Sequence, residues 1–480
     1  MKADRLRYLT QETYLTYERL GDDLIAVNPD QAYLCFENAA FLAPDDGERE
    51  RLSEKNRVLK SMRPVGVRKV CILILSYNQK GLTENCLGSI AANCDPQTVS
   101  LIVLDNASTD GSAEWLGDYV AAHAADRDNC EMVLLCSDEN LGFPAGCNAA
   151  AAYASPEEDI FLLNNDTQLP ANALFWLRMG LYESDDIGAV SGFQDIGSIE
   201  QTEKMTLDRP EEFMEYGARH NVFSEHPYEE RTKISGFAML IRHGLFGELG
   251  GFDEQFSPGY FEDDDLCYRI REAGYRLMVC RNSLIYHAGG QSFSKRPDVR
   301  ELFERNRRKF IEKWGNDSID MIELSDFQMI IWSLDNAFWS GTLDEDDVTP
   351  IPRNIDLVRV AADRGILNAV CSVNDRDAVE RELQSERFEN LWDLFVMSSA
   401  DRTPKGGRIR KMLEIMAMRP ENALYVDGDA FERQEAKRML PGLQVAPPSI
   451  LRELYMQLKK YEPTDPEHKR LAQYRKMTEG

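Results

Sequence analysis

Four apolar runs, each ending in polar residues, constrain the fold of this chain more than any other feature. They are KVCILILSYN (69–78), LIVLDNAS (101–108), MVLLCSDEN (132–140) and DIFLLNNDT (159–167). Such runs are typical of parallel strands buried on both faces, here in a strand–turn–helix alternation. Because the carboxyl ends of parallel strands meet at one edge of a sheet, the polar residues are expected to gather there. The pattern predicts an open α/β fold with a nucleotide-type site at that edge.

The charge balance excludes one large class of partners. The chain has 480 residues with 55 Lys+Arg against 82 Asp+Glu, a net charge of −27. Nucleic-acid binding needs a concentrated basic surface, so DNA and RNA are excluded as expected partners. A phosphorylated small molecule stays open, because one arginine, one metal ion or one helix N-terminus suffices to hold it.

The cysteines and the N-terminus predict a cytoplasmic protein. The ten cysteines form no C-x-x-C pair, and several lie inside apolar runs, as buried free thiols do in a reducing compartment. The first 14 residues lack the apolar core of a signal peptide. No stretch reaches the roughly 18 apolar residues of a transmembrane segment.

Composition divides the chain into three predicted domains: residues 1–66, 67–318 and 319–480. The first reads as all-helical, with apolar residues at three- and four-residue spacing. Within it, Leu20-Gly21, Ala32, Ala39 and Pro44 resemble a single tetratricopeptide repeat; an ordinary helical hairpin is the alternative. A single repeat cannot bury its own face, so we expect it to pack on the next domain, on a partner protein or on a second copy in a homodimer.

The third region repeats the α/β pattern. FQMIIWSLDN (327–336), GILNAVCSVND (365–375) and NALYVDGDA (422–430) are short apolar runs ending in polar residues, separated by helical stretches. They predict a second α/β domain, followed by a charged helical tail after Pro447.

Eight segments between residues 70 and 295 resemble the family 2 glycosyltransferases, especially their rhamnosyltransferase-like branch. They are ILSYN (74–78), LDNASTDGS (104–112), NLGFPAGCN (140–148), LLNNDT (162–167), SGFAMLIR (235–242), GGFDEQF (250–256), YFEDDDLCYRIREAGY (260–275) and YHAGGQS (286–292). The resemblance implies a Rossmann-like GT-A core and a UDP-, dTDP- or GDP-sugar donor. It also implies inverting transfer of the sugar to an acceptor hydroxyl, here expected on a protein or peptide, with a polysaccharide or lipid-linked glycan as the alternative.

The donor residues follow from the same resemblance. Tyr77 is placed to stack on the nucleobase with Ser76 and Asn78 beside it, and Asp105 to accept the ring N–H of the base. The alternative for Asp105 is a turn-forming role in DNAST. The other residues assigned to the donor are Asn106, Asn140, Gly142, Asn148 and Asn165; for Asn140, Gly142 and Asn148 a structural turn role is equally compatible.

A divalent metal is expected at LLNNDT, where the family usually carries D-x-D. Asn164 replaces the first aspartate, which leaves Asp166 as the carboxylate ligand, and the resemblance adds His287. One carboxylate, one imidazole and phosphate oxygens suit Mn²⁺ or Mg²⁺, and the histidine favours Mn²⁺.

The acidic run at 262–265 is expected at a helix N-terminus, where acidic residues are also good caps. By the family motif, Asp263 is the general base that deprotonates the acceptor. Glu262 and Asp265 are assigned to orienting the acceptor or holding the loop.

The C-terminal region resembles the haloacid-dehalogenase (HAD) superfamily, in particular its FkbH-like branch. The segments are IIWSLDNAFWSGTLDEDD (330–347), ILNAVCSVND (366–375), TPKGGRIRKMLE (403–414) and ALYVDGDAFERQEAKRMLPGLQV (423–445). Ser333 stands where the superfamily has its attacking aspartate, and a neutral serine would need a base that no motif supplies. The residues that still match the superfamily's acid, phosphate and metal positions are Asp335, Ser372, Lys405, Asp427 and Asp429. We expect a catalytically dead module used for protein contact.

Two competing interpretations remain. One is a non-catalytic assembly protein in which both α/β domains have decayed, and the other is phosphoryl transfer by the C-terminal domain. The retention of Asp105, Asp166, Asp263 and His287 favours a working transferase.

Overall fold

The computed structural model describes residues 13–124, 129–194, 210–242, 244–289, 298–314, 327–343, 348–401, 403–448, 450–459 and 462–478. They form two compact units, Met1–Lys309 and Phe310–Gly480. The expected boundary at 318/319 lies outside the described residues, as do residues 290–292 of the YHAGGQS segment and the acidic residues 344–347. Each unit is described by itself.

Unit 1 is built on an eight-stranded mixed sheet with the order β3-β2-β1-β4-β8-β6-β9-β7. β1 to β4 are parallel, β8 is antiparallel to both its neighbours, and β7 is antiparallel to β9. The strands are β1 (Lys69–Ser76), β2 (Val99–Asp105), β3 (Glu131–Cys136), β4 (Glu158–Asn164), β6 (Ile187–Phe193), β7 (Tyr228–Arg231), β8 (Ala238–Ile241) and β9 (Arg276–Leu284). A separate pair joins β5 (Thr167–Gln168) to β10 (Tyr286–His287).

The four apolar runs of the sequence are the four parallel strands, as predicted. Ser76 at the end of β1 lies opposite Asp105 at the end of β2, and Leu75 lies opposite Asn164 at the end of β4. The polar residues that follow these strands therefore meet at one edge of the sheet. The prediction of burial on both faces is wrong for β3, which is only partly buried because it is an edge strand.

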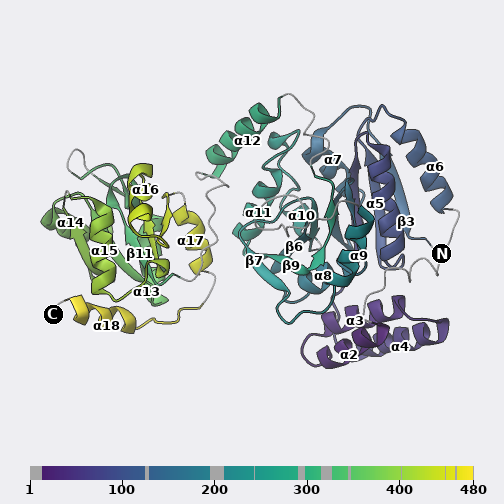
Figure 1. The fold of residues 1–480 in the computed structure, drawn as a ribbon, viewed down its shortest axis with the longest axis horizontal. Coiled ribbons are helices and arrows are strands. Elements are labelled where there is room, and N and C mark those ends of the chain that lie inside the picture. Colours follow the sequence, from purple (N-terminus) through teal and green to yellow (C-terminus); the bar gives the residue numbers. More distant parts are fainter. Residues whose placement is uncertain are drawn as a thin grey trace. The chain divides into compact units, whose positions relative to one another are not determined.

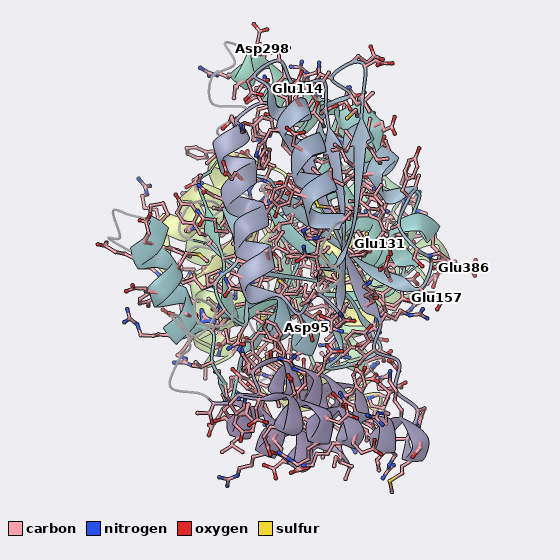
Figure 2. The ribbon with its side chains drawn as sticks, turned by 90° about the vertical axis from the view of Figure 1, so that its right-hand side faces the viewer. Asp95, Glu114, Glu131, Glu157, Asp298 and Glu386 are labelled. Carbon is pink, nitrogen blue, oxygen red and sulfur yellow. The ribbon has the colours of Figure 1, made fainter. Side chains whose placement is uncertain are left out.

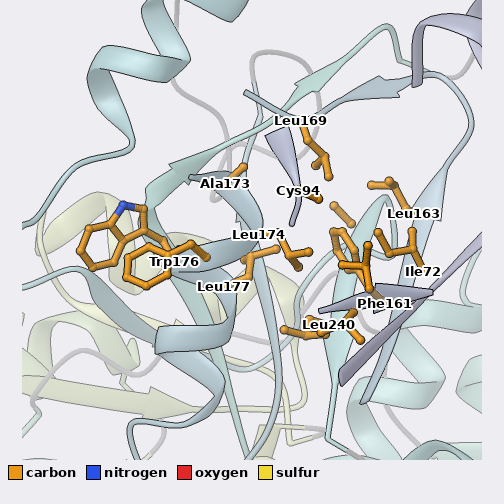
Figure 3. Close-up of a cluster of buried hydrophobic side chains, with 14 of the residues drawn as sticks. Ile72, Cys94, Phe161, Leu163, Leu169, Ala173, Leu174, Trp176, Leu177 and Leu240 are labelled. Atoms are coloured by element: carbon orange, nitrogen blue, oxygen red, sulfur yellow. The ribbon is translucent and has the colours of Figure 1, made fainter. Parts of the chain in front are cut away.

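Helices cover both faces of this sheet (Figure 1). Side chains of α5, α6 and α8 join the hydrophobic cluster on one face, and those of α7, α10 and α11 join the cluster on the other. α8 is buried along its whole length, and its Leu174 and Leu177 lie in the same cluster as Phe161 of β4 (Figure 3). The helices of this core are α5 (Lys80–Asn93), α6 (Ser112–Ala124), α7 (Gly142–Ala151), α8 (Ala173–Leu181), α9 (Pro210–His220), α10 (Leu245–Glu248), α11 (Glu262–Glu272) and α12 (Val299–Trp314).

The N-terminal segment is helical, as expected, and packs on α8 of its own chain. It comprises α2 (Tyr14–Leu24), α3 (Pro29–Phe41) and α4 (Asp46–Met62). The Tyr17 ring contacts the rings of Phe175 and Trp176 at centroid distances of 5.1 and 6.2 Å. Gln31 donates to the Met179 carbonyl at 2.8 Å. The apolar face of the expected repeat is thus covered within unit 1.

One buried ion pair fastens these helices to the sheet domain. Arg178 of α8 bonds the Glu37 carboxylate of α3 and donates to the Arg68 carbonyl at 3.0 Å. Burial raises the pKa of Glu37, and the facing guanidinium opposes that shift. Removal of either partner would leave a buried charge uncompensated and would strongly lower the free energy of unfolding.

Unit 2 is a second α/β unit with a five-stranded sheet of order β15-β14-β11-β16-β17, parallel throughout. Helices cover both faces, since α13, α14 and α17 join one hydrophobic cluster and α15, α16 and α18 the other. The strands are β11 (Met329–Trp332), β14 (Leu367–Ser372), β15 (Phe395–Ala400), β16 (Ala423–Val426) and β17 (Gln444–Ala446). The helices are α13 (Pro352–Asp363), α14 (Arg376–Leu383), α15 (Lys405–Ile415), α16 (Ala430–Met439), α17 (Ile450–Lys459) and α18 (Lys469–Thr478).

The surface and the thiols agree with the composition. Exposed acidic side chains such as Glu114, Glu131 and Glu157 carry part of the net negative charge into solvent (Figure 2). All ten cysteines are free thiols, eight of them buried. None of the helices in the described ranges combines the length and apolarity that a bilayer crossing demands.

Candidate functional site

The carboxyl edge of the unit 1 sheet collects most of the residues predicted to bind a donor. The strand order reverses between β1 and β4, the position at which open α/β sheets bind ligands. Tyr77 directly follows β1 and is 37% exposed. Asn165 and Asp166 directly follow β4.

The two carboxylate oxygens of Asp105 differ in their hydrogen bonding. The side chain is 2% exposed, and its Oδ2 accepts the Ser108 amide at 3.0 Å, which is the turn role. Its Oδ1 is buried without a hydrogen-bond partner among the described residues. A buried carboxylate oxygen costs free energy unless a donor reaches it, and the ring N–H of a nucleobase is such a donor. The turn role therefore uses Oδ2 and leaves Oδ1 for the predicted contact with a nucleobase.

Asn106 and Asn140 hold the loop in front of α7. Asn106 Oδ1 accepts the Leu141 amide at 2.9 Å, and Asn106 Nδ2 donates to Asn140 Oδ1 at 3.1 Å. Gly142 has a φ of +78°, and a Cβ there would lie 2.8 Å from Pro258 Cα. The loop needs glycine here for both reasons. These bonds are structural, and they bring the α7 N-terminus against the segment that precedes α11.

Asn148 joins α7 to another loop. Its Nδ2 donates to the Phe252 carbonyl at 2.9 Å and to Glu254 Oε1 at 3.0 Å, and its Oδ1 accepts the Phe252 amide at 2.8 Å. All its hydrogen-bonding groups are engaged, which supports the structural alternative over donor contact.

A second set of polar bonds orders the end of β1. Asn78 Oδ1 accepts the Thr109 amide at 2.8 Å. Ser76 is fully buried and lies 3.2 Å from Thr83 Oγ1, which accepts Asn165 Nδ2 at 3.0 Å. This chain fixes β1 and the segment after β4 relative to each other, next to Tyr77.

Asp166 and His287 meet because β5 pairs with β10. His287 lies opposite Thr167, and its Nε2 is 3.2 Å from Asp166 Oδ1. Gln194 Oε1 lies 2.7 Å from Nδ1, so Nδ1 donates this hydrogen bond and Nε2 faces the carboxylate. A metal ion or a proton on Nε2 would each join this nitrogen to the carboxylate.

The donor set fits a divalent metal ion. Asn164 Oδ1 is buried near this pair without a hydrogen-bond partner in the described part of the chain. One carboxylate, one imidazole and an amide oxygen are ligands that Mn²⁺ and Mg²⁺ accept. Within the described ranges no third His, Cys, Asp or Glu joins the pair, so the remaining positions would fall to phosphate and water oxygens.

Asp263 lies in the first turn of α11 and is partly buried. Its Oδ2 accepts the Gly236 amide at 3.0 Å, and its Oδ1 accepts the Asp264 amide at 2.9 Å. Burial and the neighbouring Asp264 carboxylate raise the pKa of Asp263 to about 6, against the two amide bonds and Lys233, which lower it. A carboxylate with this pKa is ionised at neutral pH and is a stronger base than an ordinary aspartate.

The two acidic neighbours assigned to the acceptor differ from each other. Glu262 is 8% exposed, and its Oε2 has no hydrogen-bond partner among the described residues. Burial, and then the charge of Asp263, raises its pKa well above the usual value. Asp265 is fully buried and bonds Arg269 Nε at 2.8 Å. This ion pair supports the role of Asp265 in holding the loop and not the role of contacting an acceptor.

Asp105, Asp166 and His287 thus lie at one sheet edge, and Asp263 bonds Gly236 in the segment that precedes β8. Residues 71–246 match the model of the family described as Glycosyl transferase family 2. This segment is therefore similar to the family 2 glycosyltransferases. It comprises nearly all of the chain from β1 to β8, which is most of the unit 1 sheet.

Two curated proteins resemble the chain over about half its length. The uncharacterized protein y4gI of Sinorhizobium fredii is 22% identical over 264 residues, which is 52% of this chain and 28% of that protein. N-acetylglucosaminyl-diphospho-decaprenol L-rhamnosyltransferase of Mycobacterium tuberculosis is 23% identical over 252 residues, 47% of this chain and 78% of the relative. The chain therefore spans little more than a quarter of the first relative and most of the second.

Solved structures with a related arrangement include GalNAc-T7 with UDP, GalNAc and Mn²⁺, at 14% identity and a TM-score of 0.42, covering 53% of this chain and 50% of that one. Another is the mannosyltransferase PcManGT of Pyrobaculum calidifontis in complex with GDP-Man and Mn²⁺, at 18% identity and a TM-score of 0.36, covering 58% and 70%.

Unit 2 has a polar cluster at the corresponding edge of its own sheet. Lys405, at the start of α15, bonds Asp427 after β16 at 2.5 Å and Ser333 after β11 at 3.1 Å. Tyr425 also donates to Asp427. Burial would raise the pKa of Asp427, but the bonds from Lys405 and Tyr425 outweigh it and the pKa is lowered. The lysine charge is thus neutralised inside the protein.

The other predicted positions of unit 2 are engaged as well. Asp335 accepts Asn374 Nδ2 at 2.9 and 3.0 Å and the Trp339 indole N–H at 3.0 Å. Ser372 Oγ accepts the Asn374 amide at 3.2 Å, and Asp429 caps α16 through the Phe431 amide at 2.8 Å. The cluster brings Ser333, Lys405 and Asp427 together.

Sequence reasoning missed several residues of the transferase site. Gln194 orients His287, Gly236 holds Asp263, and Phe237 stacks on the His287 ring at a centroid distance of 5.1 Å. Gly236 and Phe237 lie inside the SGFAMLIR segment, so the resemblance pointed to their neighbourhood but not to their contacts. Asn306 of α12 was also missed, because it lies in a basic run that reads as an ordinary solvated helix.

Proposed function

We propose that the transferase domain moves a sugar from a nucleotide-sugar donor to an acceptor hydroxyl by direct displacement with inversion. The observation that carries this proposal is the position of Asp263, a carboxylate with a raised pKa at the same sheet edge as the donor residues. Asp263 takes the proton of the acceptor hydroxyl as its oxygen attacks the anomeric carbon, and the nucleoside diphosphate leaves. A single displacement needs no covalent nucleophile on the protein.

The other residues of the edge bind and orient. Tyr77 stacks on the nucleobase, Asp105 Oδ1 accepts its ring N–H, and Asp166 with His287 would hold the divalent ion. That ion, when bound, would supply positive charge beside the diphosphate. Glu262, whose Oε2 has no hydrogen-bond partner among the described residues, would orient the bound acceptor.

The acceptor is better matched by a glycan than by a polypeptide. The expectation of a protein acceptor rested partly on an unpaired N-terminal repeat in need of a partner, and in unit 1 that repeat is covered by α8. The same packing removes the argument for a homodimer. The rhamnosyltransferase relative is named for a lipid-linked sugar acceptor, which favours a glycan hydroxyl here. A protein or peptide acceptor is the second candidate.

A donor-hydrolysis assay tests this function. The chain is incubated with UDP-, dTDP- and GDP-sugars plus Mn²⁺, and release of nucleoside diphosphate is followed with water as the acceptor. We expect slow release from one donor class alone, with a rate that falls as the pH is lowered through about 6, because the base must be ionised and its pKa is about 6. Equal, trace release from every donor would contradict the proposal, and a rate independent of pH between 5 and 8 would contradict the role of Asp263.

For unit 2 we propose a catalytically inactive, HAD-like module that serves protein contact. Ser333 supplies no carboxylate nucleophile, Lys405 is paired with Asp427, and Asp335 is engaged by Asn374 and Trp339. A phosphoryl group would thus find neither an attacking carboxylate nor an unpaired lysine in this cluster.

We expect no phosphatase turnover from this module. The test incubates the full chain with p-nitrophenyl phosphate and Mg²⁺ and compares it with Asp335→Ala; both should match the buffer blank. Turnover that the Asp335→Ala substitution abolishes would overturn the proposal and restore phosphoryl transfer as a function of unit 2.

A further inference from the structure

A single buried asparagine holds the segment that leads into the proposed base. Asn306 lies in the middle of α12 and is 0% exposed. Its Nδ2 donates to the carbonyls of Phe256 at 2.5 Å, Gly259 at 2.8 Å and Tyr260 at 3.2 Å. The amide has two N–H groups for three acceptors, so one N–H is shared. Without this side chain, buried carbonyls would lose their donors.

The segment that Asn306 holds, residues 256–261, has an unfavourable backbone. Tyr260 and Phe261 both adopt positive φ angles, 73° and 74°. This conformation is costly for residues with side chains and persists only where the surroundings enforce it. Phe303, one turn before Asn306, packs its ring against Tyr260 at 5.8 Å and Phe261 at 5.1 Å. α12 therefore fixes the segment through both hydrogen bonds and ring contacts.

The same segment connects the base to the donor loop. Phe261 is the N-cap residue of α11, two residues before Asp263, and its carbonyl accepts the Asp265 amide at 2.9 Å. On the other side, the Pro258 carbonyl accepts the Phe143 amide at 2.9 Å, and Pro258 is the close neighbour that requires glycine at 142. A shift of the segment would move the start of α11 relative to the N-terminus of α7.

We propose that Asn306 is a positioning residue of the transferase site. By holding three carbonyls of segment 256–261, it fixes the first turn of α11 and so sets the Asp263 carboxylate against Gly236 and facing the donor loop. Asn306 itself touches no reacting atom. The inference rests on the proposed function in that Asp263 is taken as the base.

The first test follows donor hydrolysis in Asn306→Ala. We expect kcat to fall by about 30-fold or more, because misplacing a catalytic group by about 1 Å costs on the order of 100-fold, while the KM for the donor changes less than threefold. Asn306→Ser, which keeps one donor, should lose less. The matched control is Lys309→Ala, which removes an exposed bond from the same helix to the Gln255 carbonyl at 2.5 Å, outside segment 256–261. Water replaces that bond, so the control should stay near wild type.

The second test needs no activity. Asp263 is faced by Glu262 and Asp264 on α11, by the Cys267 thiol on the same helix and by Lys233 before β8. Because its ionised form is disfavoured there, Asp263→Asn should raise the melting temperature at pH 8 by a few degrees. In the Asn306→Ala background the gain should shrink to less than half, while in the Lys309→Ala background it should persist. Calorimetry of the wild type, the three single variants and the two double variants gives this coupling.

The outcomes separate the two proposals. An equal gain from Asp263→Asn with and without Asn306, or a donor KM that rises in step with the loss of kcat, would overturn the positioning role. If the wild type releases no nucleoside diphosphate from any donor while the coupling is present, the proposed function fails and the placement of Asp263 by Asn306 stands.

Discussion

Asp263→Asn is expected to abolish sugar transfer and leave donor binding intact. The amide keeps one oxygen, which can accept the Gly236 or the Asp264 amide, and it cannot accept a proton at neutral pH. Loss of a general base costs about 10²- to 10⁴-fold in kcat. The donor residues Tyr77 and Asp105 lie on other elements, so the dissociation constant of the donor should change by less than threefold. Turnover is measured by nucleoside diphosphate release and binding by calorimetric titration.

The same substitution should stabilise the protein above pH 6. Burial and Asp264 raise the pKa of Asp263 in the folded state to about 6, so folding favours the protonated form. The stability from this group is fully present below the unfolded pKa and is lost as the pH rises through about 6. Asp263→Asn avoids that loss and should add about 1–3 kcal/mol at pH 8, with the gain shrinking as the pH falls below 6. Glu131→Ala, at an exposed carboxylate, is the matched control. A variant that retains turnover, or that gains nothing at pH 8, would contradict the assignment of the base.

Removal of the divalent ion should lower donor release by about 100-fold. Asp166 and His287 bring a carboxylate oxygen and an imidazole nitrogen within 3.2 Å of each other, and a diphosphate that leaves without positive charge beside it is a poor leaving group. EDTA should therefore stop release, and added Mn²⁺ should restore it. Asp166→Ala should remove the response to Mn²⁺ altogether.

Gln194→Ala provides a graded comparison. The substitution removes the hydrogen bond to His287 Nδ1 and leaves the two proposed metal ligands in place. Loss of such a supporting residue lowers metal affinity by about 10- to 100-fold. We expect it to raise the Mn²⁺ concentration needed for half-maximal release without lowering the rate at saturation. Release that persists in EDTA, or an Asp166→Ala variant that still responds to Mn²⁺, would contradict the metal site.

The strands and the sheet edge of the proposed donor site were predictable from the sequence because the signal is local. Each apolar run is long enough to identify a parallel strand, and parallel strands place their carboxyl ends together whatever their order. The pattern of apolar runs alone therefore predicted that one edge would carry Ser76, Asp105 and Asp166. The pairing of β5 with β10 was not predictable, since two-residue strands leave no period to read, and the contact of Asp166 with His287 reached the prediction only through the family motif.

Roles that depend on which partner a polar side chain finds could not be predicted. Asn148 and Asp265 carry groups suited to ligands, yet the fold supplies Phe252, Glu254 and Arg269 as their partners. Asn306 shows the opposite. Its neighbours in sequence are basic and polar, yet its side chain is buried and bonds carbonyls that lie 46 to 50 residues earlier in the chain. The N-terminal repeat was correctly expected to need a cover, but the sequence could not choose among its own α8, a second copy and a partner.

The most direct test of the account is a thermal-shift panel of UDP-, dTDP- and GDP-sugars, each with and without Mn²⁺. A ligand that binds the native state stabilises it by mass action. The free energy of unfolding rises by about 2.7 kcal/mol at a ligand concentration of 100 times the dissociation constant, and the melting temperature rises with it. The account predicts that one nucleotide class stabilises the protein, that Mn²⁺ increases the shift, and that Asp105→Ala abolishes it while Asp263→Asn leaves it unchanged. No shift with any nucleotide sugar, or a shift that survives Asp105→Ala, would contradict a donor site at the edge formed by β1, β2 and β4.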